Sequence, residues 1–329
     1  MAARLGFFVA AISILIRFII ASQSGMQPSQ GQEIMQGLLQ QLSPEILSAL
    51  QNMTTSLLAG GAIFTALALV PGVACNPGKP WWRNRGLATD GCYLALNAIL
   101  AMYLSTAVAI AVALTLTLFL PAVEIIRLLQ GNGPFARFPL AAQCALYLAI
   151  SDFLLYWIHR GFHRKILWPF HAIHHASEDV DWTSGYRMHP INLALSAHLV
   201  PLLMLYLGIP LEVIILLAPL DTAVGYFVHS NLNWTLGPLR YVIATPVFHR
   251  WHHTRSNQGG AANFAPTFAI WDVLFGTFFM PAGALPARYG IDDQAFPPRF
   301  TRQLVYPFEE LLRLIGLRKR LPPVEGSTL

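Results

Sequence analysis

The chain has 329 residues, of which 55% are hydrophobic and 11% are charged, whereas soluble domains carry about 25% charged residues. This balance excludes an ordinary soluble domain and predicts an all-α, polytopic membrane protein. The net charge is +5, but the basic residues are scattered between apolar stretches, which excludes a nucleic-acid-binding surface. The cysteines form no Cys-x-x-Cys pair, so neither a thiolate zinc site nor a disulfide framework is predicted.

Long apolar stretches predict about four to five transmembrane helices, because a helix needs about 20 apolar residues to cross a bilayer. An apolar stretch at residues 5–21, with Arg4 before it and Arg17 near its end, is expected to be an uncleaved anchor rather than a signal peptide. Later spans are predicted at residues 54–75, 92–120 and 138–158, and a hairpin of two spans is predicted at 192–228 with its turn near Gly208-Ile209-Pro210.

Two blocks of histidines share the spacing His-x-x-His-His. The first block lies between Trp157 and His175, and the second runs from His249 to His253. Residues three and four apart lie on one face of a helix, so each block directs several imidazoles at one point, as a metal site requires. With His229, the blocks give nine candidate ligands, enough for two metal ions: His159, His163, His171, His174, His175, His229, His249, His252 and His253.

At these residues the chain resembles the fatty acid hydroxylase/sterol desaturase superfamily, a group of integral-membrane di-iron oxygenases. The resemblance covers about residues 76–280 and depends on the order and spacing of several motifs, since one His-x-x-His-His alone would be a weak sign. The matching segments are Asp152–His163, His171–His175, Arg187–Pro190, His229–Asn231, His249–His253, Asn263-Phe264 and Trp271–Thr277.

The resemblance implies an oxidoreductase that binds two iron ions and uses dioxygen and external electrons to hydroxylate or desaturate a C–H bond of a sterol or fatty-acyl lipid. Imidazole ligands alone do not select iron, and zinc is expected to be able to replace it. The chain has no Gly-x-Gly-x-x-Gly loop and no cysteine pattern for an iron–sulfur cluster, so a separate reductase or small redox carrier must supply the electrons.

Several residues outside the two blocks are candidates for supporting roles. Asp152, seven residues before His159, is expected to orient a ligand, because carboxylates commonly hold the outer nitrogen of a metal-bound histidine. Asn233 is expected to reach the site through a water. His189 is a further candidate ligand, with a supporting or structural role as the alternatives. Asp221 and Asp272 carry the same expectation as Asp152, Asn263 a weaker version of that for Asn233, and His198 is expected to be structural.

Three regions are predicted: an anchor and amphipathic region at 1–55, a catalytic membrane domain at 56–281, and a tail at 282–329 that contains an amphipathic basic helix. Basic residues, among them Arg187 and Arg250, surround the histidine blocks, which predicts that the metal site faces the cytoplasm. The final residues carry no retrieval signal for the endoplasmic reticulum, which favours a bacterial inner membrane.

Two other classes of protein remain open on the residues alone. A dinuclear zinc hydrolase would use a metal-bound hydroxide, but such sites normally include a carboxylate ligand, and no acid lies within the His-x-x-His-His spacings. A metal transporter or sensor is the non-enzymatic alternative. Transporter sites lie near the middle of the bilayer, whereas these histidines are predicted at the cytoplasmic ends of the spans.

Overall fold

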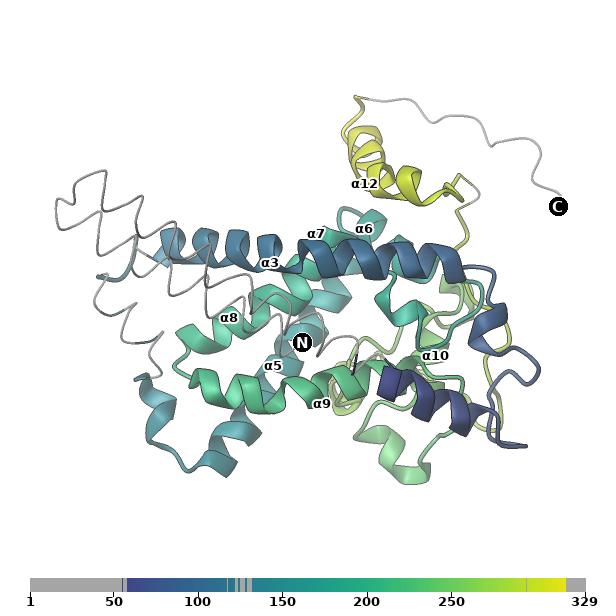
Figure 1. Cartoon of the computed structure of the whole chain (residues 1–329), viewed down its shortest axis with the longest axis horizontal. Helices are drawn as coiled ribbons and strands as arrows, with labels where there is room; N and C mark the ends of the chain where they lie inside the picture. Colours follow the sequence, from purple (N-terminus) through teal and green to yellow (C-terminus); the bar gives the residue numbers. More distant parts are fainter. Residues whose placement is uncertain are drawn as a thin grey trace. The chain divides into compact units, whose positions relative to one another are not determined.

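The computed structural model describes residues 55, 58–116, 118–121, 124, 128, 132–293 and 295–317, and the predicted anchor at 5–21 lies outside them. All regular secondary structure in these ranges is helical, which confirms the predicted all-α class. The longer helices are α3 (Leu87–Leu116), α5 (Leu140–Phe162), α9 (Leu211–His229) and α12 (Phe300–Leu314), and the shorter ones are α6 (Trp168–His175), α7 (Pro190–Leu193), α8 (Leu199–Tyr206), α10 (Pro246–His252) and α11 (Ile270–Leu274) (Figure 1).

The chain divides into two compact units, each assembled from three separate segments. The first, here called the helical unit, comprises Met1–Gly60, Asn97–Leu154 and Leu193–Ala223. The second, here called the histidine unit, comprises Gly61–Leu96, Leu155–Asn192 and Val224–Leu329. Helices α5 and α9 begin in the helical unit and end in the histidine unit. The histidine unit contains all nine predicted ligands.

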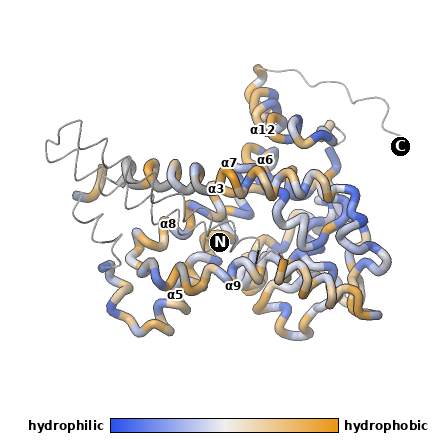
Figure 2. Tube along the Cα trace, in the orientation of Figure 1, coloured by the Kyte–Doolittle hydropathy of each residue, from blue (hydrophilic) through white to orange (hydrophobic). Residues whose placement is uncertain are grey.

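Two helical segments are long and apolar enough to cross a membrane, namely α5 and the part of α9 from Glu212 to His229. Hydrophobic residues run along both helices (Figure 2). A third crossing arises if Leu87–Ala101 and Thr106–Val112, which meet at a bend of 47° in α3, form one span. The described residues therefore contain two, or up to three, candidate spans, and the total of four to five, which includes the span at 5–21, stays a prediction.

The other predicted spans fall short because the chain turns early. The helix Leu58–Ala68 is followed by a turn in which Gly72 has a φ of 77°, and the apolar helical stretch Pro190–Tyr206 is also shorter than the two candidate spans. A helix of 17 residues is about 26 Å long, less than the hydrocarbon core of about 30 Å. The predicted hairpin turn is confirmed, because Gly208 lies between α8 and α9 with a φ of 89°.

Short helices build the histidine unit, and prolines set where two of them begin. Helix α6 starts at Trp168-Pro169, after the exposed turn Arg164–Leu167, and α10 starts at Pro246. Proline in the first helical turn has no N–H to leave unpaired, and its fixed φ suits a helix. Thr245 caps α10, because its Oγ1 accepts a hydrogen bond of 3.1 Å from the N–H of Phe248. These starts fix the direction in which each helix presents its histidines.

Candidate metal centre

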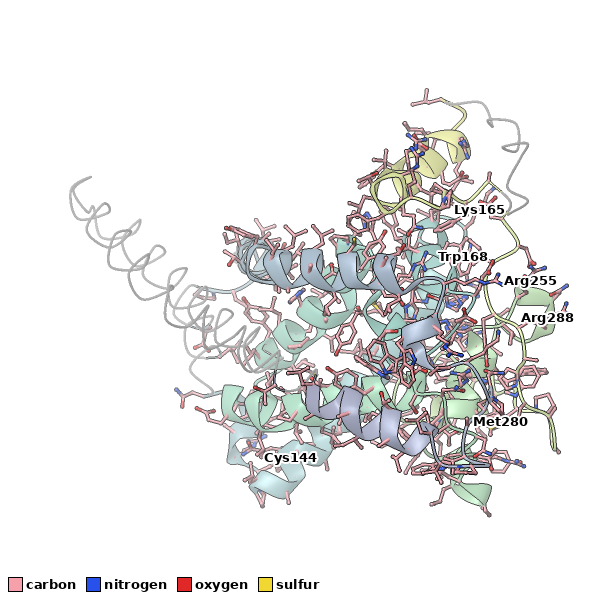
Figure 3. All side chains as sticks on the ribbon, turned by 45° about the vertical axis from the view of Figure 1, so that its right-hand side comes forward. Cys144, Lys165, Trp168, Arg255, Met280 and Arg288 are labelled. Carbon is pink, nitrogen blue, oxygen red and sulfur yellow. The ribbon has the colours of Figure 1, made fainter. Side chains whose placement is uncertain are left out.

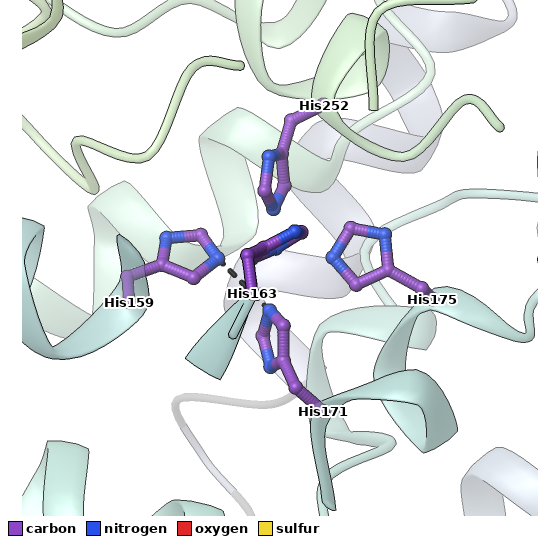
Figure 4. A group of neighbouring side chains, drawn as sticks. All are labelled: His159, His163, His171, His175 and His252. Carbon is purple, nitrogen blue, oxygen red and sulfur yellow. Dashed lines mark hydrogen bonds between the residues drawn. The ribbon is translucent and has the colours of Figure 1, made fainter. Parts of the chain in front are cut away.

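The histidine unit gathers all nine predicted ligands into two groups, and the ligand nitrogens within each group lie within 4.8 Å of one another. The five-histidine group consists of His159, His163, His171, His175 and His252, whose rings converge on one point (Figure 4). The four-histidine group consists of His174, His229, His249 and His253.

Each His-x-x-His-His block contributes to both groups. In the first block, His175 belongs to the five-histidine group and its neighbour His174 to the four-histidine group. In the second block, His252 and His253 divide in the same way. Adjacent residues of a helix point about 100° apart, so one His-His pair reaches two neighbouring points. The repeated pair is therefore the sequence feature that gives rise to two groups.

In three rings of the five-histidine group, the outer nitrogen, Nδ1, which faces away from the point where the rings converge, forms a hydrogen bond to a protein oxygen. The Nδ1 atoms of His159 and His252 donate to the carbonyl oxygens of Phe264 and Ala262, at 2.6 and 2.7 Å. The Nδ1 of His171 donates to Oδ1 of Asn192 at 2.7 Å. Because a carbonyl oxygen can only accept, the proton of each neutral ring stays on Nδ1 and the lone pair of Nε2 is free for a metal. The Nε2 atoms of His159 and His171 lie 2.9 Å apart.

The four-histidine group is held in a different way. Its Nε2 atoms follow one another at 3.2 Å from His174 to His229, 3.0 Å from His229 to His249, and 3.1 Å from His249 to His253. One outer nitrogen is held, since Nδ1 of His229 donates to the carbonyl oxygen of Gly225 at 2.8 Å. The buried Nδ1 atoms of the other three rings have no hydrogen-bond partner among the described residues. Packing alone sets the orientation of those three rings.

Burial keeps the histidines outside the candidate spans neutral. Desolvation is the largest cause that holds their pKa values well below the ordinary value of 6.5, and the charges of neighbouring histidines lower them further. A neutral imidazole is the form that binds a metal. The histidines concerned are His163, His171, His174, His175, His249, His252 and His253.

The donor set fits metal ions that accept imidazole. The buried Nε2 atoms of His163, His175 and His252 have no hydrogen-bond partner among the described residues, and a buried nitrogen without a partner costs about 1–3 kcal/mol. A bound metal removes that cost by accepting the lone pair. Neither group includes a carboxylate or a thiolate from the described part of the chain. Iron, zinc, copper and nickel all suit such ligands.

Asp272 acts on a ligand through the backbone. Its carboxylate accepts hydrogen bonds from the N–H groups of Phe264 and Ala265, both at 2.8 Å, and from Oγ1 of Thr277 at 2.6 Å. Burial raises the pKa of Asp272 to about 6, although these hydrogen bonds oppose the rise. The carboxylate thus fixes the segment whose Phe264 carbonyl holds His159.

Asn263 fixes the same segment from another side. Its φ is 61°, a left-handed conformation that asparagine tolerates better than most residues. Its side-chain amide donates to the carbonyl oxygens of Phe248 and Phe279, at 2.8 and 2.7 Å, and accepts from the N–H of Phe279 at 2.7 Å. The neighbouring residue Ala262 supplies the carbonyl that holds His252. Asn263 therefore supports the site without facing the ligands directly.

Asp152 and Asp221 belong to the helical unit. Asp221 accepts a hydrogen bond of 3.4 Å from the hydroxyl of Tyr147, and Asp152 is buried. The outer nitrogens of His159 and His229, which these acids were expected to orient, are held by backbone carbonyl groups instead. A contribution of Asp152 to the reaction remains a prediction.

The structure brings neither His189 nor Asn233 into the two groups. The Nδ1 of His189 accepts from the N–H of Ile191 at 3.1 Å, and its Nε2 lies 3.3 Å from the carbonyl oxygen of Leu304. Both of its ring nitrogens are thereby used inside the fold. The side-chain amide of Asn233 donates to the carbonyl oxygen of Gly72 at 2.6 Å, which fastens the turn after the helix Leu58–Ala68.

Sequence reasoning counted Arg250 among the basic residues around the histidine blocks and missed its structural role. Its side chain is 1% exposed. The guanidinium donates to the carbonyl oxygens of Val180, at 2.5 Å, and Ser230, at 3.4 Å, and to the side chain of Asn76. Arg250 therefore fastens the helix that carries His249 to other segments of the histidine unit. Its position between two predicted ligands, in His-Arg-Trp-His-His, was the only sequence sign of this role.

Comparisons with known proteins connect this site to a family. The family model described as "Fatty acid hydroxylase" matches residues 144–277. Ornithine lipid hydroxylase OlsE of Rhizobium tropici is 34% identical over 52% of this chain and 52% of its own length. Human alkylglycerol monooxygenase is 34% identical over 39% of this chain and 28% of its own length. Methylsterol monooxygenase 1-1 of Arabidopsis thaliana is 26% identical over 48% of this chain and 53% of its own length.

The chain spans about half the length, or less, of these relatives. No solved structure is a significant match. All nine predicted ligands lie within the motifs on which the resemblance was based, and all nine lie inside the matched range. Residues 144–277 match the fatty acid hydroxylase family model, and this confirms the resemblance predicted from the histidine motifs.

Proposed function

We propose that this chain is a membrane-bound monooxygenase that hydroxylates a C–H bond of a lipid, with two iron ions held by the five-histidine and four-histidine groups. The observation that carries the proposal is the convergence of nine histidines, neutral where their pKa can be assigned, within a region of the fatty acid hydroxylase family. Two bound iron ions would supply the reduction of dioxygen and the oxidation of the C–H bond.

The residues of the chain have three tasks in this proposal. The nine histidines hold the metals, and the carbonyl oxygens of Phe264, Ala262 and Gly225 fix the rings that touch them. Burial limits the access of bulk water, since seven of the nine histidines are buried and His159 and His163 are half-buried. Neutral rings prevent the charge repulsion that nine imidazolium ions would cause.

The names of the relatives support hydroxylation of a lipid. Their printed names are hydroxylase and monooxygenase, and they act on ornithine lipids, alkylglycerols and methylsterols. We therefore favour hydroxylation over desaturation, and a membrane lipid over a soluble substrate. Helix α5 carries His159 on its last turn, and α9 ends at His229, so each of the two candidate spans leads directly to a ligand.

We further propose that both groups face the cytoplasm of a bacterial cell and that a separate protein supplies electrons. The exposed cations Arg164 and Lys165 directly follow α5, which supports a cytoplasmic end for that span. Cysteine-labelling reporters at Lys165 and Arg255 should both react from the cytoplasmic side, and a reporter at Gly133 from the opposite side. Labelling of Lys165 and Arg255 from different sides would contradict this topology.

The deciding experiment compares the lipids of cells that express the intact chain with those of cells that express His174→Ala, using mass spectrometry. A lipid that gains about 16 mass units under ordinary dioxygen and about 18 under ¹⁸O₂ is expected only with the intact chain. Dioxygen uptake by the purified chain should require ferrous iron and a reductant. A product formed without dioxygen would favour the zinc hydrolase, and metal binding without any product would favour a transporter or sensor.

A further inference from the structure

A short turn outside the two histidine groups combines unpaired cations with an exposed apolar side chain. Arg164 and Lys165 lie exposed between α5 and α6, and within the described part of the chain neither forms an ion pair or hydrogen bond through its side chain. Ile166 follows them with 66% of its side-chain surface exposed. Cations around a small apolar contact suit a brief encounter with an acidic protein.

The residue that follows this turn connects it to the metal centre. Trp168 begins α6 and is half-buried (Figure 3). Its ring centroid lies 5.1 Å from that of His163 and 5.4 Å from that of His175, both members of the five-histidine group. One side chain therefore touches two predicted ligands and also reaches the surface next to the cations. Electron transfer slows steeply with the distance between redox centres, so such a side chain marks a short route inward.

We propose that residues 164–166 are the docking surface for a small, acidic, one-electron carrier protein, and that Trp168, next to this surface, is the contact through which electrons reach the five-histidine group. The proposal rests on the proposed function, because it needs a metal that accepts electrons there. Insertion of one oxygen atom into a C–H bond consumes one dioxygen, two electrons and two protons and releases one water. Two reduced carriers are thus oxidised for each product, one electron from each.

The first test measures docking without any need for a bound metal. The full chain in lipid nanodiscs is titrated with an oxidised, acidic [2Fe–2S] ferredoxin as the probe. The double variant Arg164→Glu/Lys165→Glu should bind at least about tenfold more weakly and lose most of the salt dependence, since electrostatic steering changes association by about 10–1,000-fold. The control Arg83→Glu/Arg288→Glu reverses the same number of exposed charges elsewhere and should bind as the wild type does. Equal loss in both variants would overturn the proposed surface.

The second test concerns Trp168 and uses a ratio of two activities. Product formation is driven either by reduced ferredoxin or by reduced methyl viologen, a small molecule that needs no docking surface. In Trp168→Leu the ratio of ferredoxin-driven to viologen-driven turnover should fall about tenfold, with ferredoxin affinity preserved, and Trp168→Phe should restore part of it. An unchanged ratio would overturn the role of Trp168. If neither donor drives product formation in the wild type, the proposed function fails, whereas the binding test still judges the docking surface.

Discussion

The two histidine groups differ in how firmly the protein holds their rings. In the five-histidine group, oxygens of Phe264, Ala262 and Asn192 hold three outer nitrogens. In the four-histidine group, Gly225 holds one, and three buried outer nitrogens have no partner among the described residues. A hydrogen-bond partner of the outer nitrogen fixes the tautomer and orientation of a histidine ligand and raises its basicity. The five-histidine group is therefore the more preorganised of the two, and we expect it to bind its metal more tightly.

The strongest way to test this difference uses two neighbouring residues that belong to different groups. His252→Ala removes a ligand of the five-histidine group, and His253→Ala removes one of the four-histidine group. Both variants should lose product formation to background, because the proposed reaction needs both ions. Metal analysis of anaerobically purified protein should give close to two ions for the wild type and close to one for His253→Ala. His252→Ala, with four ligands left in its group, should retain more metal.

The same two variants can also contradict the proposed difference between the two histidine groups. Full occupancy of both sites in both variants would show that these histidines are not ligands. Greater metal loss from His252→Ala than from His253→Ala would mean that the held rings do not confer the tighter site. Far-ultraviolet circular dichroism of each variant serves as the control for correct folding.

The next effect concerns pH, because acid should lower the stability of the metal-free protein. The seven histidines with lowered pKa values are neutral when folded, while the unfolded chain takes up protons below a pKa of about 6.5. Their contribution to stability is therefore complete above pH 6.5 and is lost as the pH falls toward the folded values. Each such histidine lowers the unfolding free energy by about 1.4 kcal/mol per pH unit in that window. The melting temperature of metal-free protein should fall steeply below pH 6.5.

Protons also compete with metals for the same nitrogens. Metal content per chain, measured after dialysis at successive pH values, should fall in two steps, and the first ion lost should come from the four-histidine group. The His253→Ala variant should show only the later step. A single step in the wild type would mean that the two groups do not differ in affinity.

A smaller effect on metal affinity is expected when the hydrogen-bond partner of the His171 ring is removed. Asn192→Ala removes the oxygen that holds Nδ1 of His171, and loss of such a partner typically costs about 10–100-fold in metal affinity or activity. Asn233→Ala is the matched control, because its amide holds the turn at Gly72 instead. Competition with a chelator measures both variants. Equal metal affinity in Asn192→Ala and wild type would contradict the idea that held rings make the five-histidine group tighter.

The smallest effect is expected for Asp152→Asn. Because the Phe264 carbonyl already holds Nδ1 of His159, removal of the Asp152 charge should leave metal content unchanged and turnover within about threefold of the wild type, as for a side chain that only pairs helices. Product formed per correctly inserted chain is the measurement, with metal content determined alongside. A loss of tenfold or more would instead support the role in orienting a ligand that the sequence predicted.

The ligands were predictable because their signal is local. Histidines three and four apart share a helical face whatever surrounds them, and all nine converge as that spacing predicts. The hydrogen-bond acceptors that orient these rings were not predictable. The carbonyl oxygens of Phe264 and Ala262 belong to the backbone, and because every residue has such an oxygen, no sequence pattern marks the two that are used. The role of Arg250 was missed for a related reason, since charge alone does not reveal that a guanidinium has three acceptors inside the fold. Apolar composition also does not record where a helix ends, such as at the turn that contains Gly72.

Helices α5 and α9 carry ligands on their last turns, His159 on one and His229 on the other. A helix that crosses a bilayer responds to its thickness by tilting, at a modest free-energy cost per ångström of mismatch. Any tilt of α5 or α9 moves the imidazole at its end relative to ligands on α6 and α10, which do not cross. The thickness of the surrounding membrane thereby becomes a variable of the coordination geometry. We therefore expect the metal affinity of the two groups to depend on the acyl-chain length of the surrounding lipids.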